Sequence, residues 1–477
     1  MTLRATALGL VVRLAQWLWL AAGLCFGLTW DALCLRSNPL SRARRVRMTF
    51  QRAGGTLVKL GQQLSLRADL LPYQVCDELR QLLDRAEPIP WEVARAKVSA
   101  QVGKLEDAFA SFDPEPIGSA SVACVYRAVR HDGRAVAVKV LRPRAREVFG
   151  ADLTLLHLCL VPAEWLMLLR SGQAANLVQQ LRTMFEEELD LRSEARYQEL
   201  FRQAVRKTRV RYLSAPAIHF DLSGADVMVS DFAEGLACDR VLAAVEEGDT
   251  AVLEQLASQQ IDPRTVAKRL LKGWNWQVFQ FPIFHGDPHP ANILVQPGGH
   301  LVLVDFGACS YFSDRGRALL RNVQLHMLAG DFRAMASAAM GLLEPYPPID
   351  VDRFGEELEL LYARYMHAAQ SDHAEWWERA TSKIWLDFIQ LARKYMIPVS
   401  LDTLRLFRAT FLLDTVVFRL DPDLKLAGVY RAYLRQEDRW LRRKYLRHGL
   451  IDRSGQPLIS EQRLQSGVAL FDKIGER

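Results

Sequence analysis

The sequence predicts an α+β protein with two lobes: a small β-rich lobe followed by a large helical lobe. A further helical unit precedes both. Short β-type runs lie at residues 121–141, 227–232 and 293–304, whereas apolar residues at helical spacing dominate elsewhere. The chain has 477 residues, of which 50% are hydrophobic and 24% are charged, so it is long enough for a sizeable globular core.

The N-terminal segment, residues 1–36, contains an apolar run from Leu14 to Trp30 that only Gln16 interrupts. Crossing a bilayer takes about 20 apolar residues, so the run is marginal unless it extends to Leu35. More arginines follow the run than precede it, which would place the rest of the protein on the cytoplasmic side if the run spans a membrane. The alternative is an apolar helix that packs on the protein's own core, and the sequence leaves both possibilities open.

Residues 37–110 are predicted to form a helical preface to the lobes. One helix is expected from Thr56 to Leu71, because leucines recur there on one face and Pro72 follows. Gly61 inside this helix costs about 1 kcal/mol relative to alanine, which indicates close packing against a neighbour. Two shorter helices are expected downstream, at Asp77–Arg85 and Trp91–Val102.

The β-rich lobe is assigned to residues 111–235. Strands are expected at Ser121–Val129 and Arg134–Leu141, because β-type runs flank the Asp132-Gly133 turn as in a hairpin. A helix over residues 174–204 and a strand over Val227–Phe232 complete the lobe.

The helical lobe is assigned to residues 236–447, with a tail at 448–477. Its first long helix is expected to begin at Asp262-Pro263 and to stop before Pro282. A polar loop and a short hairpin follow, with strands at Ile293–Gln296 and Leu301–Val304 around a Pro-Gly-Gly turn. Residues 315–447 are predicted to be mostly helical.

The polar loop from His285 to Asn292 carries the strongest chemical signal. Asp287 and Asn292 are five residues apart, and Asp305 opens an Asp-Phe-Gly loop thirteen residues beyond Asn292, past the hairpin. Phosphoryl transfer from a nucleotide needs one carboxylate at the acceptor, and an amide and a second carboxylate on the magnesium. The order and spacing of these parts are far more specific than any one part. His285 and His289 are expected to brace the loop through hydrogen bonds.

Lys139 ends the alternating strand Val136-Ala137-Val138-Lys139, a position that suits a contact with nucleotide phosphates. Such a lysine needs a carboxylate partner. The acidic helix offers Glu186, Glu187, Glu188, Asp190 and Glu194. At 100° per residue Asp190 and Glu194 share a face, while Glu188 lies about 120° away, so one helix permits two pairings. Glu186 and Glu187 are expected to be solvated.

The phosphate-covering loop should precede Lys139, and it reads Gly118-Ser119-Ala120-Ser121. A Gly-x-Gly-x-x-Gly pattern is absent, but small side chains still let backbone amides approach phosphates. With fewer glycines the loop should be stiffer.

These motifs resemble the UbiB/AarF group of atypical protein-kinase-like proteins, over about Thr56 to Asp423. The most specific mark is Lys59-Leu60-Gly61-Gln62 in the preface. An alanine-rich loop, in place of a glycine-rich one, lies at Gly118–Ser121. A Glu-x-Asp motif lies at Glu188–Asp190. A loop close to the family's His-x-Asp-Pro-His-Pro-Gly-Asn lies at His285–Asn292.

The resemblance implies a two-lobed protein-kinase-like fold and a gate over the mouth of its active site. Lys139 would pair with Glu194, whereas Lys59 of the preface would pair with Glu188. Gln62 and Asp190 belong to the same two gating motifs.

The resemblance also implies the parts that hold ATP and Mg²⁺. Asn292 and Asp305 would bind the metal, and Asp287 would occupy the catalytic position. Asp231, in the segment that joins the lobes, would contact the nucleotide beside the alanine-rich loop. This chain departs from the family pattern without losing a magnesium ligand or Lys139: it has Ala291 for glycine, Cys124 for glutamine, Asp231 for glutamate and Leu66 for threonine.

The expected function is ATP binding with magnesium-dependent hydrolysis or phosphoryl transfer, in support of quinone or isoprenoid lipid metabolism at a membrane. A preface helix across the cleft would exclude a bulky peptide but admit water or a small acceptor. The alternatives are a true protein kinase, and a nucleotide-sensing scaffold that binds lipid or protein with little turnover.

Charge and cysteine content narrow the partners and the compartment. The net charge is +6, and much of the excess lies in Arg36–Arg47 and Arg435–Arg447, which suits an anionic membrane surface or solvation better than nucleic acid. The expected partners are ATP, the membrane surface, and isoprenoid quinones or their precursors. Seven scattered cysteines indicate a reducing compartment without structural zinc. We expect the cytoplasmic side of a membrane, with an organellar matrix or soluble cytoplasm as alternatives.

Overall fold

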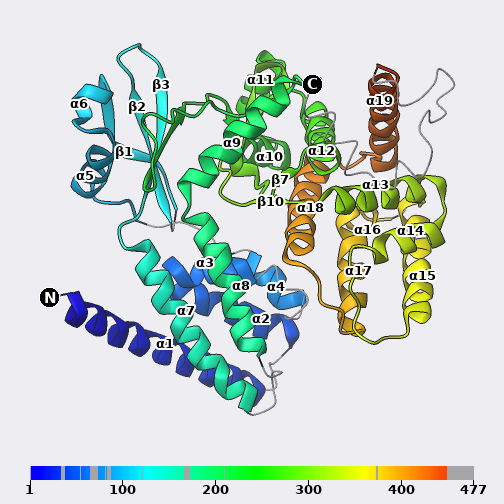
Figure 1. The fold of residues 1–477 in the computed structure, drawn as a ribbon, viewed down its shortest axis with the longest axis horizontal. Coiled ribbons are helices and arrows are strands. Elements are labelled where there is room, and N and C mark those ends of the chain that lie inside the picture. The colour runs from blue at the N-terminus through cyan, green and yellow to red at the C-terminus, as the bar shows by residue number, and fades with distance from the viewer. Residues whose placement is uncertain are drawn as a thin grey trace.

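The computed structural model describes ten stretches of the chain, residues 2–33, 38–53, 55–64, 73–80, 82, 87–120, 122–165, 172–208, 210–371 and 374–447. They form a small β-rich lobe, a large helical lobe and a group of N-terminal helices beside the small lobe (Figure 1). This arrangement confirms the predicted two-lobed α+β fold.

The N-terminal helices are α1 (Thr2–Leu33), α2 (Pro39–Ala53), α3 (Gly55–Leu64) and α4 (Tyr73–Arg80). Helices α1 and α3 pack against α7 (Ala145–Trp165), and α3 also packs against α8 (Gln173–Glu188), while α2 and α4 pack on each other and on α3 (Figure 1). Leu57 and Leu60 of α3 share one buried apolar cluster with Phe149 of α7 and Phe185 of α8. A Cβ added at Gly61 would lie 2.4 Å from Leu82 Cδ1 and 2.9 Å from Phe50 Cδ1. The expected close approach at this glycine is therefore confirmed, whereas the predicted helical residues 65–71 lie outside the described residues.

Helix α1 uses one face for packing and leaves another exposed. Trp17 and Leu20 pack against the cluster of α3, α7 and α8, and the Trp17 indole donates a hydrogen bond of 3.2 Å to Asp152 of α7. On the exposed side, Trp19 and Phe26 are 73% and 68% accessible. Among the described residues, no helix is both long enough and apolar enough to cross a membrane. Through Trp17 and Leu20, helix α1 packs on the rest of the protein.

The small lobe is an antiparallel sheet in the order β1-β2-β3-β5, with strands Ser111–Ser119, Ala123–Val129, Ala135–Leu141 and Val227–Asp231. The hairpin at Asp132-Gly133 is confirmed. Strand β1 was not predicted, because Pro114 and Pro116 interrupt its pattern, but a strand at the edge of a sheet tolerates proline.

Helices α5 (Trp91–Val102) and α6 (Leu105–Ala108) cover one face of this sheet. Ala94 and Val98 of α5 are buried in one cluster with Val136 and Val138 of β3. These helices therefore pack with the β-rich lobe rather than with the preface, so the predicted boundary at residue 110 lies too far along the chain.

The helix predicted over residues 174–204 is two helices, α8 and α9 (Leu191–Arg206). The break falls at Leu189 and Asp190, where the Asp190 carboxylate caps α9 by accepting hydrogen bonds from the Arg192 and Ser193 amides at 3.1 and 3.2 Å. The angle of about 120° predicted between Glu188 and the face of Asp190 and Glu194 assumed one continuous helix, so it does not hold across this break. Helix α7 was also missed, because Pro162 lies within its sequence.

The helical lobe begins with α10 (Cys238–Glu247), α11 (Thr250–Ser258) and α12 (Pro263–Gln280), which starts at the predicted Asp262 cap. Short strands follow in the chain and carry the polar loop, namely β7 (Ile283–His285), β8 (Ile293–Gln296), β9 (His300–Leu303) and β10 (Cys309–Tyr311). Strands β4 (Leu213–Ser214) and β6 (Leu236–Ala237) flank the β8–β9 hairpin. The rest is helical, as predicted: α13 (Asp314–Ala329), α14 (Phe332–Met340), α15 (Val351–Gln370), α16 (Trp376–Arg379), α17 (Thr381–Lys394), α18 (Leu401–Leu420) and α19 (Leu426–Arg447).

Asp414 of α18 is an acid buried in the core of this lobe. Its Oδ2 accepts a hydrogen bond of 2.7 Å from the Ser382 amide, and burial raises the pKa of Asp414 to about 7. The folded protein therefore keeps a proton that the unfolded chain releases between about pH 4 and pH 7. The stability contributed by this group is present at low pH and is lost as the pH rises through that window.

Replacing Asp414 with Asn should therefore stabilise the protein increasingly as the pH rises. The advantage of Asp414→Asn over the wild type should grow between about pH 4 and pH 7, by up to roughly 4 kcal/mol. Thermal midpoints of both proteins at pH 5 and pH 8 test this. Asp423→Asn, at a side chain that is 85% exposed, is the control and should show no such trend. A constant difference for Asp414→Asn across this pH range would contradict the prediction.

Candidate active site

The floor of the candidate site is a row of residues across the small sheet. Strand pairing places Gly118, Val125, Lys139 and Met228 side by side on β1, β2, β3 and β5. Residues paired across a sheet point to the same face, so this row lies on the face that carries the Lys139 side chain. A Cβ added at Gly118 would meet no atom within 4 Å, so the space above this end of the row is open, whereas Met228 at the other end is buried.

Lys139 joins both lobes through two carboxylates. Its Nζ lies 2.7 and 2.9 Å from the two Glu194 carboxylate oxygens and 3.0 Å from Asp305 Oδ1. Glu194 is buried on α9, whereas Asp305 is in the Asp-Phe-Gly loop of the helical lobe. The predicted pair of Lys139 and Glu194 is therefore formed, and Asp305 is added to it.

The two carboxylates hold Lys139 in its charged form. Burial alone would lower the pKa of Lys139, but Asp305 and Glu194 outweigh this effect and raise the pKa above its ordinary value. Burial raises the pKa of Glu194, and the charge of Lys139 opposes that rise. Removing either partner of such a buried pair leaves an uncompensated charge, which typically costs about 3–5 kcal/mol.

The polar loop is braced by His285, as expected. Its Nε2 lies 3.2 Å from the Val304 carbonyl oxygen, and its Nδ1 accepts a hydrogen bond of 3.3 Å from the Asp287 amide. Burial lowers the pKa of His285, so the ring is neutral and can donate at Nε2 while accepting at Nδ1. His289 similarly accepts from the Ala291 amide at 3.2 Å. Both histidines therefore hold the backbone that presents Asp287.

The β8–β9 hairpin brings Asn292 and Asp305 to one end of the strands. Ile293 pairs with Leu303, and the Val304 amide donates to the Asn292 carbonyl oxygen at 3.0 Å. One amide and one carboxylate are hard oxygen ligands of the kind that Mg²⁺ prefers. No cluster of three His, Cys, Asp or Glu side chains suited to a metal occurs in the described part of the chain. Asn292 and Asp305 would supply two oxygen ligands, which suits Mg²⁺ because this ion usually takes one or two protein ligands and completes its shell with phosphate oxygens and water.

Asp305 has a left-handed backbone with φ of 61°, a conformation that aspartate tolerates better than most residues. Phe306, the next residue, is buried against Phe201 of α9 and against the His285 ring, each at a centroid distance of 5.1 Å. Helix α9 carries both Phe201, which packs on Phe306, and Glu194, which shares Lys139 with Asp305, so one helix supports this loop at two residues.

The alanine-rich loop is held by Arg142, a residue that the sequence did not single out. Its Nε donates to the Ala120 carbonyl oxygen at 2.7 Å, and another guanidinium nitrogen donates to Ser119 Oγ at 2.9 Å. A hydrogen bond from the Ala120 amide to the Ala123 carbonyl oxygen at 2.9 Å tightens the turn. Ser121, the last predicted loop residue, lies outside the described residues.

Arg408 is a second residue that the sequence did not reveal. It lies on α18, far from the motifs in the chain, and a guanidinium nitrogen lies 3.2 Å from Asp287 Oδ1. One turn earlier, Arg405 pairs with Glu187 at the end of α8. Glu186 is exposed as expected, but Glu187 is paired rather than merely solvated.

Arg408→Gln is expected to lower kcat for the reaction proposed below by about 10- to 100-fold. The guanidinium fixes the Asp287 carboxylate, and a misplaced catalytic group loses rate of about this size. The KM for ATP should change by less than about threefold, because Arg408 contacts the carboxylate rather than the sheet floor. Steady-state kinetics give kcat and the KM for ATP separately. Arg408→Lys should restore part of the lost kcat. An unchanged kcat, or a loss confined to KM, would contradict this role.

The residues predicted to gate the site are only partly described. The Gln62 amide donates to the Leu82 carbonyl oxygen at 3.0 Å, within the preface. Asp190 caps α9, and hydrogen bonds from Ser193 lower its pKa against the opposing effect of burial. Glu188 ends α8, but the Lys59 side chain lies outside the described residues, so the predicted pair of Lys59 and Glu188 stays a prediction.

Asp231 is not brought together with Lys139. It pairs with Val136 in the sheet, so its side chain lies on the face opposite Lys139. There its Oδ1 lies 2.9 Å from His219 Nε2. Its predicted contact with the nucleotide would have to come from its backbone.

The chain is similar to known proteins over most of its length. The model of the ABC1 atypical kinase-like domain matches residues 81–339. A relative named "Probable protein kinase UbiB" from Xylella fastidiosa is 30% identical over 426 residues, covering 86% of this chain and 72% of that protein. Proteins of the same name from Pseudomonas putida and Marinobacter nauticus are each 28% identical; the alignments cover 90% and 86% of this chain and 76% and 72% of those proteins.

A solved structure shares the fold. It is the complex of Rv3197 with erythromycin from Mycobacterium tuberculosis, with a TM-score of 0.50 and 21% sequence identity. The match covers 77% of this chain and 89% of that chain.

Proposed function

The chain belongs to the ABC1 atypical kinase-like family, and from this we propose that it binds ATP with Mg²⁺ and hydrolyses it or transfers its γ-phosphate to a small acceptor. The observation that carries the proposal is the cluster of Lys139, Glu194 and Asp305, which joins the two lobes at one point.

The residues of this cluster and two residues of the polar loop would each have a role in this chemistry. The charged Lys139 would bind phosphate oxygens, and Glu194 would hold it in place. Asp287 would accept the proton of the attacking water or acceptor hydroxyl. Asn292 and Asp305 would hold Mg²⁺, which when bound neutralises charge on the phosphates.

The preface supports a small acceptor rather than a protein. Leu57 and Leu60 of α3 lie in the same buried cluster as Val122 and Ala123, which follow the alanine-rich loop. A helix packed beside this loop narrows the approach to the γ-phosphate. Water or a small molecule would pass where a peptide substrate would meet the preface.

We place this activity at a membrane surface, in support of quinone or other isoprenoid lipid metabolism. Support comes from the exposed aromatic side chains of α1 and from the arginines of α2, since this combination favours anionic lipid interfaces. Arg42 and Arg44 of α2 are exposed. The relatives named UbiB support the link to quinone lipids.

Replacing the exposed aromatic residues of α1 should weaken membrane binding. The triple variant of Trp19, Phe26 and Trp30, each to Ser, should bind vesicles containing anionic lipid at least about tenfold more weakly, because it loses buried apolar area at the interface. Flotation with neutral and anionic vesicles measures this. Phe220→Ser with Trp377→Ser is the matched control, because both side chains are exposed elsewhere. Equal binding by the triple variant and the wild type would place the contact elsewhere.

The activity itself is tested by phosphate release from ATP, with Mg²⁺ or with chelator, and with or without anionic vesicles and an isoprenoid phenol. Turnover that requires Mg²⁺ and is lost in Lys139→Met would support the proposal. Nucleotide binding without turnover in all these conditions would contradict it and favour the scaffold. Transfer of label to an added protein, without phosphate release, would favour a protein kinase.

A further inference from the structure

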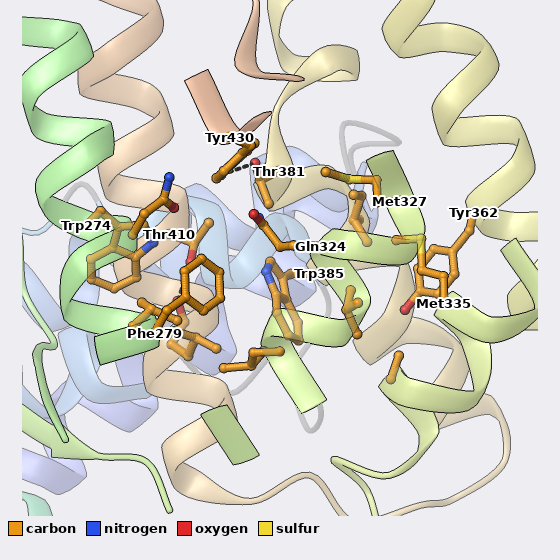
Figure 2. Close-up of a pocket in the computed structure, with 17 residues that line it drawn as sticks. Trp274, Phe279, Gln324, Met327, Met335, Tyr362, Thr381, Trp385, Thr410 and Tyr430 are labelled. Atoms are coloured by element: carbon orange, nitrogen blue, oxygen red, sulfur yellow. Dashed lines mark hydrogen bonds between the residues drawn. The ribbon is translucent and has the colours of Figure 1, made fainter. Parts of the chain in front are cut away.

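Arg142 lies beside the phosphate-covering loop, where a charged side chain can act on a bound nucleotide. The hollow inside the helical lobe offers no such group. Aromatic side chains such as Trp274 and Trp385 line it, the Tyr430 hydroxyl lies 2.9 Å from Thr381 Oγ1 there, and no charged side chain of the described residues lines it (Figure 2). Arg142 therefore offers what the hollow lacks, a permanent positive charge next to the loop of the nucleotide site.

Arg142 follows β3 and donates four hydrogen bonds. Its backbone amide donates to the Val122 carbonyl oxygen at 2.8 Å, so the main chain as well as the side chain holds the turn of the alanine-rich loop. Besides its bonds to Ala120 and Ser119, the guanidinium donates to the Glu87 carbonyl oxygen at 2.6 Å. Because the guanidinium is planar and rigid, it joins the loop to Glu87 in one fixed geometry.

The segment that holds Glu87, just before α5, is itself fixed to the small sheet. Ile89 is buried, its amide donates to Cys124 Sγ at 3.4 Å, and its carbonyl oxygen accepts from the Tyr126 hydroxyl at 3.4 Å. A proline flanks Ile89 on each side, and each proline ring fixes the backbone angle φ. The loop is therefore tied to a rigid support rather than to a mobile side chain.

Arg142 holds the loop from the side of the sheet that faces away from Lys139. Strand pairing places Ser119, Cys124 and Val140 in one row, next to the row of Lys139, so their side chains lie on the opposite face. Val140 is buried there in one cluster with residues of α5. The guanidinium bound to Ser119 therefore supports the loop from behind, and the face that carries Lys139 stays free for phosphates.

We propose that Arg142 is a positioning residue for nucleotide binding, because it holds the alanine-rich loop in the shape that receives the phosphates. A loop that must be ordered when a ligand binds weakens the affinity, and a loop that is held in advance avoids this loss. Arg142 also keeps the Ala120 carbonyl oxygen turned toward the guanidinium rather than toward the like-charged phosphate oxygens. This inference rests on the proposed function, and it gives a role to a residue outside the sequence motifs.

Arg142→Gln should raise the Kd for ATP by about tenfold or more and change kcat by less than about threefold, because the loop loses its order while the catalytic groups are untouched. Calorimetry of the full chain with ATP and Mg²⁺ gives Kd, and phosphate release gives kcat. Arg144→Gln is the matched control, since it removes the same charge from a side chain that is 67% exposed and pairs with Glu147. An unchanged Kd in Arg142→Gln, or an equal loss in both variants, would overturn the proposal.

Arg142→Lys separates the support of the loop from a simple effect of charge. Lysine keeps the positive charge but has a single nitrogen, so it cannot join the loop to Glu87 as the guanidinium fork does. The affinity for ATP should therefore recover only in part, and full recovery would overturn the proposal in favour of charge alone. Ser119→Ala loses one of the bonds and should raise the Kd for ATP by about two- to threefold, which keeps the test open if Arg142→Gln fails to fold.

Hydrogen exchange of the nucleotide-free protein tests the support of the loop without any ligand. The Ala120 amide, which donates to the Ala123 carbonyl oxygen at 2.9 Å, should exchange at least about tenfold faster in Arg142→Gln than in the wild type. Unchanged exchange would overturn the proposal. ATP binding by the wild type without turnover would count against the proposed enzyme, and the ratio of Kd values would still decide the role of Arg142. A wild type that binds no ATP would overturn both proposals.

Discussion

Asp305→Asn should reduce magnesium-dependent ATP turnover by about 100- to 1,000-fold while leaving the fold intact. The loss is large because Asp305 would hold the metal and contacts Lys139 at 3.0 Å, so its charge acts on both. The fold should survive because the left-handed backbone at this position, with φ of 61°, is one that asparagine adopts as readily as aspartate.

Three measurements separate this effect from a general loss of structure. Phosphate release gives kcat, calorimetry gives nucleotide affinity with and without Mg²⁺, and the thermal midpoint reports the fold. The magnesium-dependent part of nucleotide affinity should disappear, whereas the thermal midpoint should change by only a few degrees. Asp423→Asn, at an exposed carboxylate, should change none of them. Full turnover in Asp305→Asn would remove Asp305 from the proposed magnesium site.

Gly286→Ala should abolish activity and destabilise the protein. A Cβ at this position would lie 2.1 Å from the Ala308 carbonyl oxygen, a backbone atom that cannot rotate away. The Gly286 amide also donates to that oxygen at 2.7 Å, next to the pairing of His285 with Cys309. The added methyl group must therefore separate the Asp287 loop from the segment after Asp305–Gly307. Overpacking of this kind typically costs about 1–3 kcal/mol.

The matched control is Gly150→Ala in α7, where an added Cβ would meet no atom within 4 Å. Alanine favours a helix over glycine by about 1 kcal/mol, so this variant should be slightly stabilised and should retain turnover. The thermal midpoint and phosphate release of both variants provide the comparison. A Gly286→Ala protein with normal activity would show that the two loops can separate without loss.

The parts of the site that local patterns encode were predictable from the sequence. The Asp132-Gly133 hairpin, the loop around Asp287 and the hairpin between Asn292 and Asp305 each lie within a few residues of their own turn signals. The loop and the second hairpin also have a fixed order along the chain, so their residues could be named before their contacts were known. The pair of Lys139 and Glu194 was implied by the family resemblance, because the residues alone left two pairings open.

The parts that depend on distant contacts were not predictable. Arg408 meets Asp287 from a helix more than a hundred residues away in the chain, and nothing in its neighbourhood marks it. Arg142 looks like an ordinary charged residue after a strand until its bonds to Ser119 and Ala120 are seen. The break at Asp190 was hidden because apolar spacing continues through it, and only the capping bonds end one helix and start another.

The break at Asp190 separates two helices of the small lobe that make different contacts. Helix α8 packs with the N-terminal helices through Phe185 and Phe149, whose rings lie 4.4 Å apart, whereas α9 carries Glu194. The two helices are separated at Leu189 and Asp190, so no continuous helix links the N-terminal helices to the ion pair of Glu194 with Lys139. A continuous helix would transmit any tilt of the N-terminal helices to Glu194. The ion pair at Lys139 is thus positioned by α9, while the packing of the N-terminal helices is carried by α8.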